Sequence, residues 1–179
     1  MTTFAALLRG VNVGGKNKIS MPDLKSSFSS LGLEDVVTYI QSGNVVFRSP
    51  ARGAQKLAAG IERQLAKDFG VDVTVVLRTA AELEKIAKGN PFAKGKPDLS
   101  KLHVVFLDRA PAKGAVAELD PERSPPDEFD VRGREIYLRL PTGMGRTKLT
   151  GDYFERRLAV AATARNWKTL QKLLELTRD

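Results

Sequence analysis

The sequence predicts an α+β fold made of two ferredoxin-like halves, each a split βαβ unit with a mostly antiparallel sheet and helices packed on one face. β-rich apolar runs and amphipathic helical patterns follow one another in the order βαββαβ over the first half. A second apolar lead strand then opens a similar series after a polar connector. The chain has 179 residues, of which 42% are hydrophobic, and this suffices for a packed core.

Helix ends and turns punctuate the first half. Ser20 is typical of a helix cap, Pro22 fits the first turn, and Gly32 ends that helix. Gly70 ends a second helix, in which apolar residues recur every four positions. Residues 42–44, Ser-Gly-Asn, suit a hairpin turn. The expected elements are strand 4–8, helix 21–31, strands 36–40 and 45–47, helix 57–69 and strand 73–77.

A connecting helix and a polar connector separate the halves. Thr79 and Glu82 form a capping box at the start of this helix, and the connector follows at 93–100. The predicted domains are therefore 1–92 and 101–179, with one compact unit as the alternative. The second half is expected as βαββα plus a final helix: strand 102–107, helix 113–119, strands 129–131 and 135–140, and helices 150–158 and 167–176.

Composition limits the function classes. The net charge is +8, and cysteine is absent, which excludes disulfides, thiol nucleophiles and cysteine-ligated zinc. No apolar run is long enough to span a membrane, and the N-terminus lacks the pattern of a secretory signal. A cytoplasmic protein without a membrane partner is the expectation, and the oligomeric state is left open.

The segment from Arg9 to Lys18 is the main functional signal. It holds three cations, three glycines and no acid. Glycines let backbone N–H groups converge on an anion, and cations strengthen the binding. It is not a Walker A motif, because Asn17 stands where Ser or Thr is required. The alternative is a solvated glycine-rich connector. The ligand-binding candidates here are Arg9, Asn12, Gly14, Gly15 and Lys16.

Three later segments add candidates. Gln41 and Asn44 flank the first hairpin turn, where turn geometry accounts for Ser42 and Gly43 but requires neither Gln41 nor Asn44. Arg146 and Lys148 lie in a second acid-free loop before a helix. Arg165 precedes the last helix, where a cation opposes the helix dipole unless an anion or a carboxylate compensates. Together with the first loop, these residues are expected to line one anion site.

Five segments taken together resemble the bacterial domain-of-unknown-function family numbered 1697. They are residues 8–15 (LRGVNVGG), 39–47 (YIQSGNVVF), 90–92 (NPF), 146–150 (RTKLT) and 163–167 (TARNW). Gly151 departs from the family, which tends to have asparagine at that position. The resemblance implies a mixed α/β fold with ferredoxin-like parts, and it implies no established activity.

The sequence favours a protein that binds a small phosphate- or carboxylate-bearing ligand through basic glycine-rich loops. An RNA- or DNA-binding module is one alternative, although the aromatic residues of an RNA-recognition motif are missing. An enzyme that acts on a phosphorylated substrate by lysine and arginine electrostatics is another. The single histidine, His103, lies in a predicted strand and favours a structural role. No metal site, cofactor or catalytic set is predicted.

Overall fold

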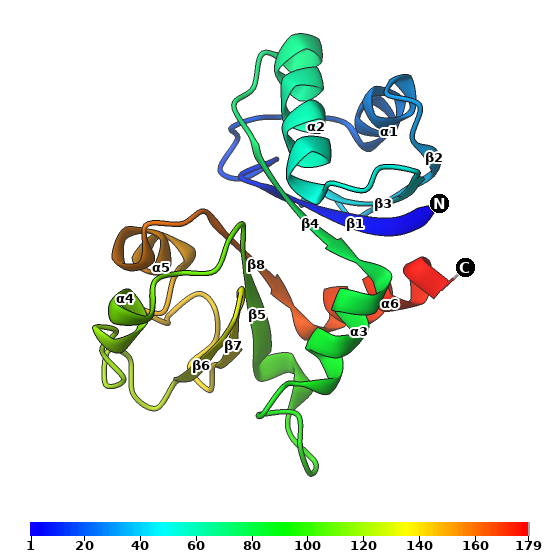
Figure 1. Cartoon of the computed structure of the whole chain (residues 1–179). Helices are drawn as coiled ribbons and strands as arrows, with labels where there is room; N and C mark the ends of the chain where they lie inside the picture. The colour runs from blue at the N-terminus through cyan, green and yellow to red at the C-terminus, as the bar shows by residue number, and fades with distance from the viewer. Residues whose placement is uncertain (179) are drawn as a thin grey trace. The chain divides into compact units, whose positions relative to one another are not determined.

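The first half forms a four-stranded antiparallel sheet with the strand order β2-β3-β1-β4 (Figure 1). The protein is described here from a computed structural model that covers residues 1–178. This order and the βαββαβ connection are those of the ferredoxin-like fold, as predicted. The elements are β1 Thr2–Arg9, α1 Met21–Ser30, β2 Glu34–Tyr39, β3 Asn44–Ser49, α2 Ala54–Phe69 and β4 Thr74–Thr79.

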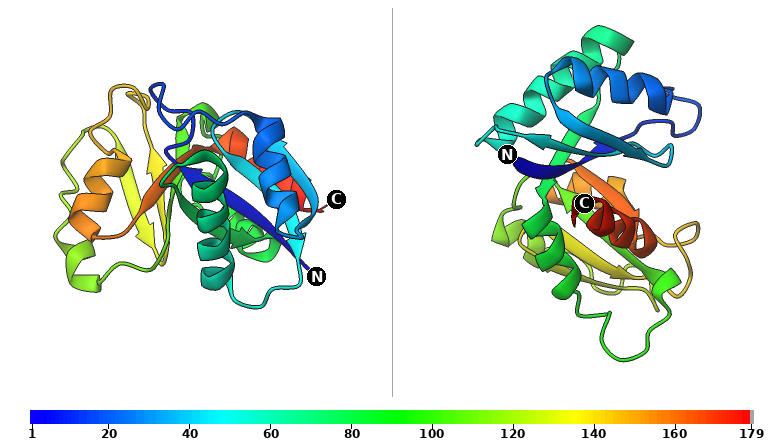
Figure 2. Two further views of the ribbon diagram at one scale, coloured as in Figure 1. Left: turned by 90° about the horizontal axis from the view of Figure 1, so that it is seen from above. Right: turned by 90° about the vertical axis from the view of Figure 1, so that its right-hand side faces the viewer.

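Helices α1 and α2 cover one face of this sheet (Figures 1 and 2). Leu24 and Phe28 of α1 are fully buried, and Phe28 packs edge-on against Phe47 of β3. The Ser20 hydroxyl accepts a hydrogen bond from the backbone N–H of Asp23, which confirms the predicted cap. Leu31 follows as the C-cap of the helix, and its side chain is exposed.

The second half forms a sheet of the same topology, with the order β6-β7-β5-β8. The expected βαββα pattern lacked the last strand, β8, which pairs with β5. The sequence does not indicate this strand, because its five residues include the polar Thr163 and Arg165 although most of the strand is buried. The elements are β5 Leu102–Leu107, α4 Lys113–Ala117, β6 Glu128–Arg132, β7 Glu135–Arg139, α5 Gly151–Leu158 and β8 Ala162–Asn166.

A helix follows each sheet, so the repeat is βαββαβα. Arg78 pairs with Ala5 and Arg165 with Val104, at matching places in the two sheets. The next residues, Thr79 and Asn166, cap the helices that follow. Each side-chain oxygen accepts a hydrogen bond from the backbone N–H three residues later in the sequence. The further elements are α3 Ala80–Lys88, the 3-10 turn η1 Leu99–Lys101 and α6 Trp167–Arg178.

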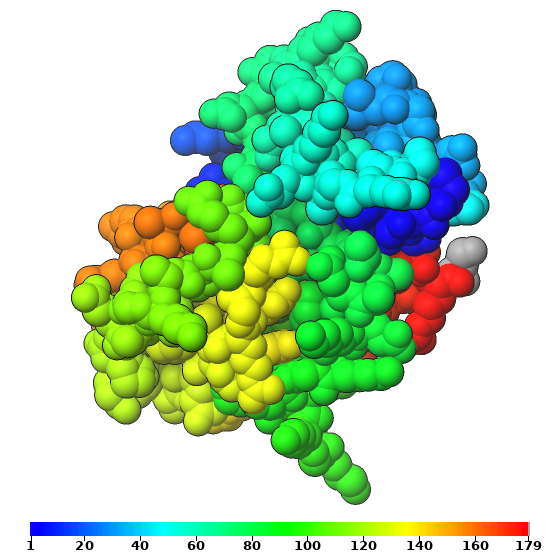
Figure 3. All heavy atoms as spheres, viewed as in Figure 1, coloured from blue at the N-terminus to red at the C-terminus, as the bar shows by residue number. Residues whose placement is uncertain are grey.

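The chain divides into two compact units. Unit 1 is Met1–Glu84 together with the C-terminal segment from Lys172, and unit 2 is Lys85–Gln171. The divisions fall inside α3 and α6. The connector at 93–98 stands out from the surface of unit 2 (Figure 3). No helix within residues 1–178 is long and apolar enough to cross a membrane.

Gly43 in the β2–β3 turn has no tolerated substitute. Its φ is +83°, its carbonyl accepts the N–H of Leu8 at 2.9 Å, and an added Cβ would lie 2.9 Å from the Leu8 Cβ. We expect Gly43→Ala to destabilise the protein by at least about 1–2 kcal/mol, from the left-handed backbone alone. Gly114→Ala is the matched control, since Gly114 is helical and has open space. Equal urea midpoints for the two variants would contradict this account.

Candidate functional site

One end of the unit 1 sheet brings the first two candidate segments together. β1 runs antiparallel to β3, so the loop after β1 and the turn before β3 lie at the same end. The Asn12 Nδ2 donates to the Gln41 carbonyl at 2.8 Å, which ties loop 10–20 to turn 40–43. The sequence predicted both segments as candidates, and the fold makes them neighbours.

The glycines of the first loop form the tip of a tight hairpin. Val13 and Lys16 form an isolated β-bridge, and the Lys16 N–H donates to the Val13 carbonyl at 3.0 Å. Gly14 and Gly15 between them have φ values of +58° and +76°. Two positive φ angles at the centre of a turn define type I′, which glycine adopts without strain. Backbone geometry therefore accounts for both glycines.

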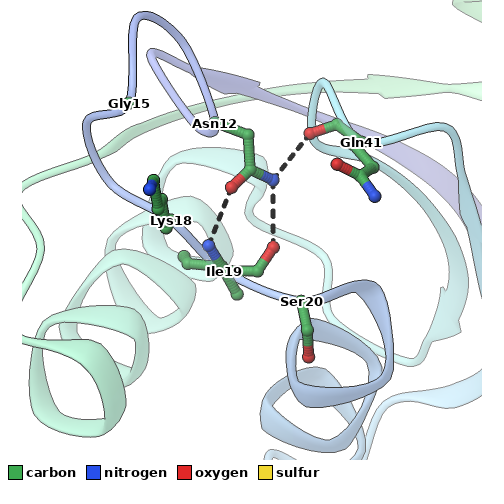
Figure 4. A pocket seen from close by; sticks show the side chains of 6 residues that line it. All are labelled: Asn12, Gly15, Lys18, Ile19, Ser20 and Gln41. Carbon is green, nitrogen blue, oxygen red and sulfur yellow. Dashed lines mark hydrogen bonds between the residues drawn. The ribbon is translucent and has the colours of Figure 1, made fainter.

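The Asn12 side chain holds the loop in shape (Figure 4). Its Nδ2 donates to the carbonyls of Ile19, at 2.9 Å, and of Gln41, and its Oδ1 accepts the Ile19 N–H at 2.8 Å. Both amide hydrogens are thus used within the chain. Asn44 acts similarly in the turn, where its buried Nδ2 donates to the Tyr39 carbonyl and the Ser42 hydroxyl. The two asparagines position backbone, and their donors are not presented to a ligand.

A pocket of about 380 Å³ opens beside this clamp (Figure 4). The side chains of Lys18 and Gln41 are exposed there, and no described residue bonds to either side chain. Lys16 is also exposed on the same loop, but it does not line the pocket, and neither does Arg9. No acidic residue within 1–178 lines the pocket. The lining residues are Asn12, Gly15, Lys18, Ile19, Ser20 and Gln41.

The N-terminus of helix α1 adds little positive potential to the pocket. Its second residue, Pro22, has no N–H, and the N–H of Asp23 is already bonded to Ser20. The Asp23 carboxylate also lies in the first turn and is exposed. An anion in the pocket would therefore depend on the lysines and on loop N–H groups, because the helix offers few donors.

The unit 2 candidates Arg146 and Lys148 are exposed on the loop between β7 and α5. Polar contacts with residues 123 and 124 fix this loop. The Lys148 N–H donates to the Ser124 hydroxyl at 3.0 Å, and the Lys148 carbonyl accepts from Arg123 Nε at 2.9 Å. Burial would raise the pKa of Asp127, but hydrogen bonds from Thr142, Thr147 and Ser124 outweigh it and lower that pKa below its ordinary value. Sequence patterns gave no sign of this carboxylate.

Arg165 is placed differently from the expectation. It lies in β8 and is buried, where a cation at a helix start was predicted. Its Nη1 donates to the Thr163 hydroxyl at 2.6 Å and to the Ala164 carbonyl at 2.9 Å. Burial lowers the pKa of Arg165 to about 10, so the guanidinium stays charged at neutral pH. The nearby carboxylate of Glu155 in α5 accepts the Ala162 N–H at 2.8 Å.

The ten candidates thus divide between the two units. Unit 2 holds Arg146, Lys148 and Arg165. The single shared site stays a prediction. Unit 1 holds Arg9, Asn12, Gly14, Gly15, Lys16, Gln41 and Asn44.

His103 lies in the core of unit 2, and its protonation is expected to lower the stability of the fold. It is buried in β5, and its Nδ1 has no hydrogen-bond partner among residues 1–178. Burial lowers the pKa of His103, while a backbone hydrogen bond at Lys101 acts in the opposite direction. Below about pH 6.5 the unfolded chain binds a proton that the folded chain resists, so stability is lost as the pH falls toward the lowered pKa.

We expect His103→Leu to lose less stability than the natural protein between neutral pH and pH values below 6.5. Urea denaturation across this range measures the difference. Parallel losses of stability in the two proteins would show that protonation of His103 is not coupled to folding.

Comparison with known proteins identifies relatives but no activity. A family model described as a protein of unknown function (DUF1697) matches residues 1–137. The solved structure of the conserved bacterial protein SP0830 from Streptococcus pneumoniae is similar over 100% of this chain and 99% of that chain, with 26% identity and a TM-score of 0.77. No curated protein matches. Neither description names a ligand or a reaction.

Proposed function

Because the chain belongs to the bacterial protein family of unknown function DUF1697, whose description assigns no activity, we propose from geometry that unit 1 binds a small phosphate- or carboxylate-bearing ligand. The observation that carries the proposal is the pocket at Lys18, where the part of the chain that the structure describes provides a cation without an ion pair and no lining acid. A cytoplasmic location remains an expectation of the sequence.

The pocket residues have different roles in this proposal. Lys18 supplies charge-assisted hydrogen bonds, and the Gln41 side-chain amide donates beside it. Gly14 and Gly15 expose their backbone N–H groups at the hairpin tip, because neither N–H is bonded among residues 1–178. Lys16 adds positive potential at the rim, and Asn12 keeps the loop in the conformation that forms the pocket.

Ligand-induced stabilisation tests the proposal. Phosphate, sugar phosphates, nucleotides and small carboxylates are titrated against the natural protein, Lys18→Ala and Lys25→Ala. A ligand at a hundred times its Kd stabilises the folded state by about 2.7 kcal/mol. We expect Lys18→Ala to lose about 1.5–3 kcal/mol of binding free energy. Lys25 is exposed on α1 outside the pocket, so Lys25→Ala should bind normally.

The controls also separate this proposal from its alternatives. If no anion stabilises the natural protein, or if Lys18→Ala responds as Lys25→Ala does, the pocket is not an anion site. Binding of RNA or DNA would weaken steeply between roughly 50 and 200 mM salt through counterion release, and binding of a small anion by one or two lysines would weaken less. An Arg146→Ala/Lys148→Ala variant tests whether the unit 2 loop contributes to the same ligand.

A further inference from the structure

Unit 1 has a second pocket, on the sheet face opposite α1 and α2. Its volume is about 380 Å³, and it is distinct from the Lys18 pocket in every lining residue. The walls come from three strands and from the last turn of α6. The lining residues are Thr3, Asp35, Val37, Val46, Phe47, Arg48, Leu176, Thr177 and Arg178.

A β-bulge in β2 creates the apolar floor. Between the pairs Glu34–Arg48 and Val37–Val46, β2 has one residue more than β3. The extra residue places Val36 in the helix-side core and turns Val37 to the opposite face, where it is 42% exposed beside Val46. A valine exposed on the floor of a pocket is a surface that an apolar ligand covers favourably.

Two arginines stand at the rim of this floor. Arg48 Nη1 lies 3.1 Å from an Asp35 carboxylate oxygen, and Arg178 Nη2 lies 3.8 Å from a Glu84 oxygen. Among the described residues each arginine forms this one ion pair, through one of its guanidinium nitrogens. A guanidinium has five N–H donors, so both arginines keep donors for a further acceptor. Of the two carboxylates in these ion pairs, Asp35 lines the pocket and Glu84 does not.

We propose that this pocket binds a small organic acid with an apolar chain and one carboxylate. The chain packs on Val37, Val46 and Leu176, and the carboxylate accepts hydrogen bonds from Arg48 and Arg178. Charge complementarity favours an anion, because among residues 1–178 two cations and one acid line the pocket. The size selects a short ligand, because the volume is at the lower end of the range for ligand sites.

Octanoate is the probe, and it is titrated into the full chain with NMR detection of the backbone amides. Octanol keeps the chain without the charge, and acetate keeps the charge without the chain. We expect saturable shifts at Val37, Val46 and Leu176 with octanoate, and at least about tenfold weaker binding of the other two. Equal affinity for octanol, or octanoate shifts centred elsewhere, would overturn the proposal.

Matched substitutions test the same residues without relying on the probe alone. Val37→Asp puts a negative charge on the floor, and Arg178→Ser removes a rim cation, so each should weaken octanoate binding about tenfold. Leu31→Asp and Arg63→Ser are the controls, since both positions are exposed in unit 1 outside the pocket. If the rim and floor variants bind as the controls do, the proposal is wrong. Far-UV circular dichroism establishes that each variant is folded.

The two sites of unit 1 are separable by experiment. Lys18→Ala should leave octanoate binding unchanged, and Val37→Asp should leave the phosphate response unchanged. Loss of octanoate binding in Lys18→Ala would mean that the acid binds at the Lys18 pocket, which overturns the second site and leaves the first intact.

Discussion

Asp127→Ala is expected to destabilise unit 2 by roughly 3–5 kcal/mol, because it removes several hydrogen bonds to a charge at about 1.5–3 kcal/mol each. Asp127 is buried, and its carboxylate accepts from the Thr142 hydroxyl at 2.6 Å, the Thr142 N–H at 3.2 Å and the Ser124 hydroxyl at 3.1 Å. Ser124 in turn accepts the Lys148 N–H. Removal of the carboxylate would leave buried hydroxyl groups without their acceptor and would loosen the loop that carries Lys148.

Hydrogen exchange at the amides of Thr142 and Lys148 reports this loosening directly, and urea denaturation reports the free energy of unfolding. Asp130→Ala is the control, since Asp130 makes a half-exposed pair with Arg132 that is worth about 0–1 kcal/mol. Similar losses for the two variants would show that the Asp127 contacts do not support the loop.

Acid gives an independent measure of the same contacts. Since the pKa of Asp127 is lowered in the folded state, its contribution is present above the unfolded-state pKa and is lost as the pH falls through the folded-state value. Asp127→Asn should therefore lose less stability than the natural protein on acidification. An identical acid dependence would contradict this reading.

Local signals in the sequence were sufficient for most of the fold. The capping box at Thr79 and Glu82 forms as predicted, with reciprocal bonds of 2.8 and 3.2 Å. Gly70 ends α2 in the left-handed conformation that favours glycine. Such signals involve residues within a few positions of one another, so they survive without knowledge of the tertiary structure. The βαββαβ order then restricts the sheet to few arrangements.

Strand β8 and its Arg165 were beyond such local reasoning. Only pairing with β5 makes this short polar segment a strand, and only its burial makes Arg165 internal. The parallel with Arg78 emerges from the register of both sheets, since the two positions have no shared sequence motif beyond the arginine and the cap that follows. Long-range pairing overrides local propensity in both respects.

The candidate site shows the same division. The sequence located the basic loop and the turn, but it gave no sign that Asn12 bonds to the Gln41 backbone or that Gly14 and Gly15 form a hairpin tip. The hydrogen bond between Asn12 and Gln41 spans 29 positions, and the need for two positive φ angles depends on the hairpin that forms. Lys18 and Ser20 line the pocket because Asn12 draws the loop over it.

Asn12→Ala is therefore expected to cost about 3 kcal/mol in stability, as three hydrogen bonds are lost at roughly 1 kcal/mol each. It should also weaken the response to the anions that the Lys18 pocket binds. Asn12→Gly separates two causes, because the φ of Asn12 is +55° and glycine tolerates it while still losing the amide. Exchange of the Ile19 amide, which donates to Asn12, should accelerate in both variants.

Comparison with Lys18→Ala makes this result decisive for the role of Asn12. Lys18 is exposed and forms no ion pair among residues 1–178, so its removal should change binding with little change in stability. Asn12→Ala should change both together. If Asn12→Ala left the free energy of unfolding intact and abolished only anion binding, Asn12 would contact the ligand directly, and the clamp that ties loop 10–20 to turn 40–43 would be unimportant for the fold.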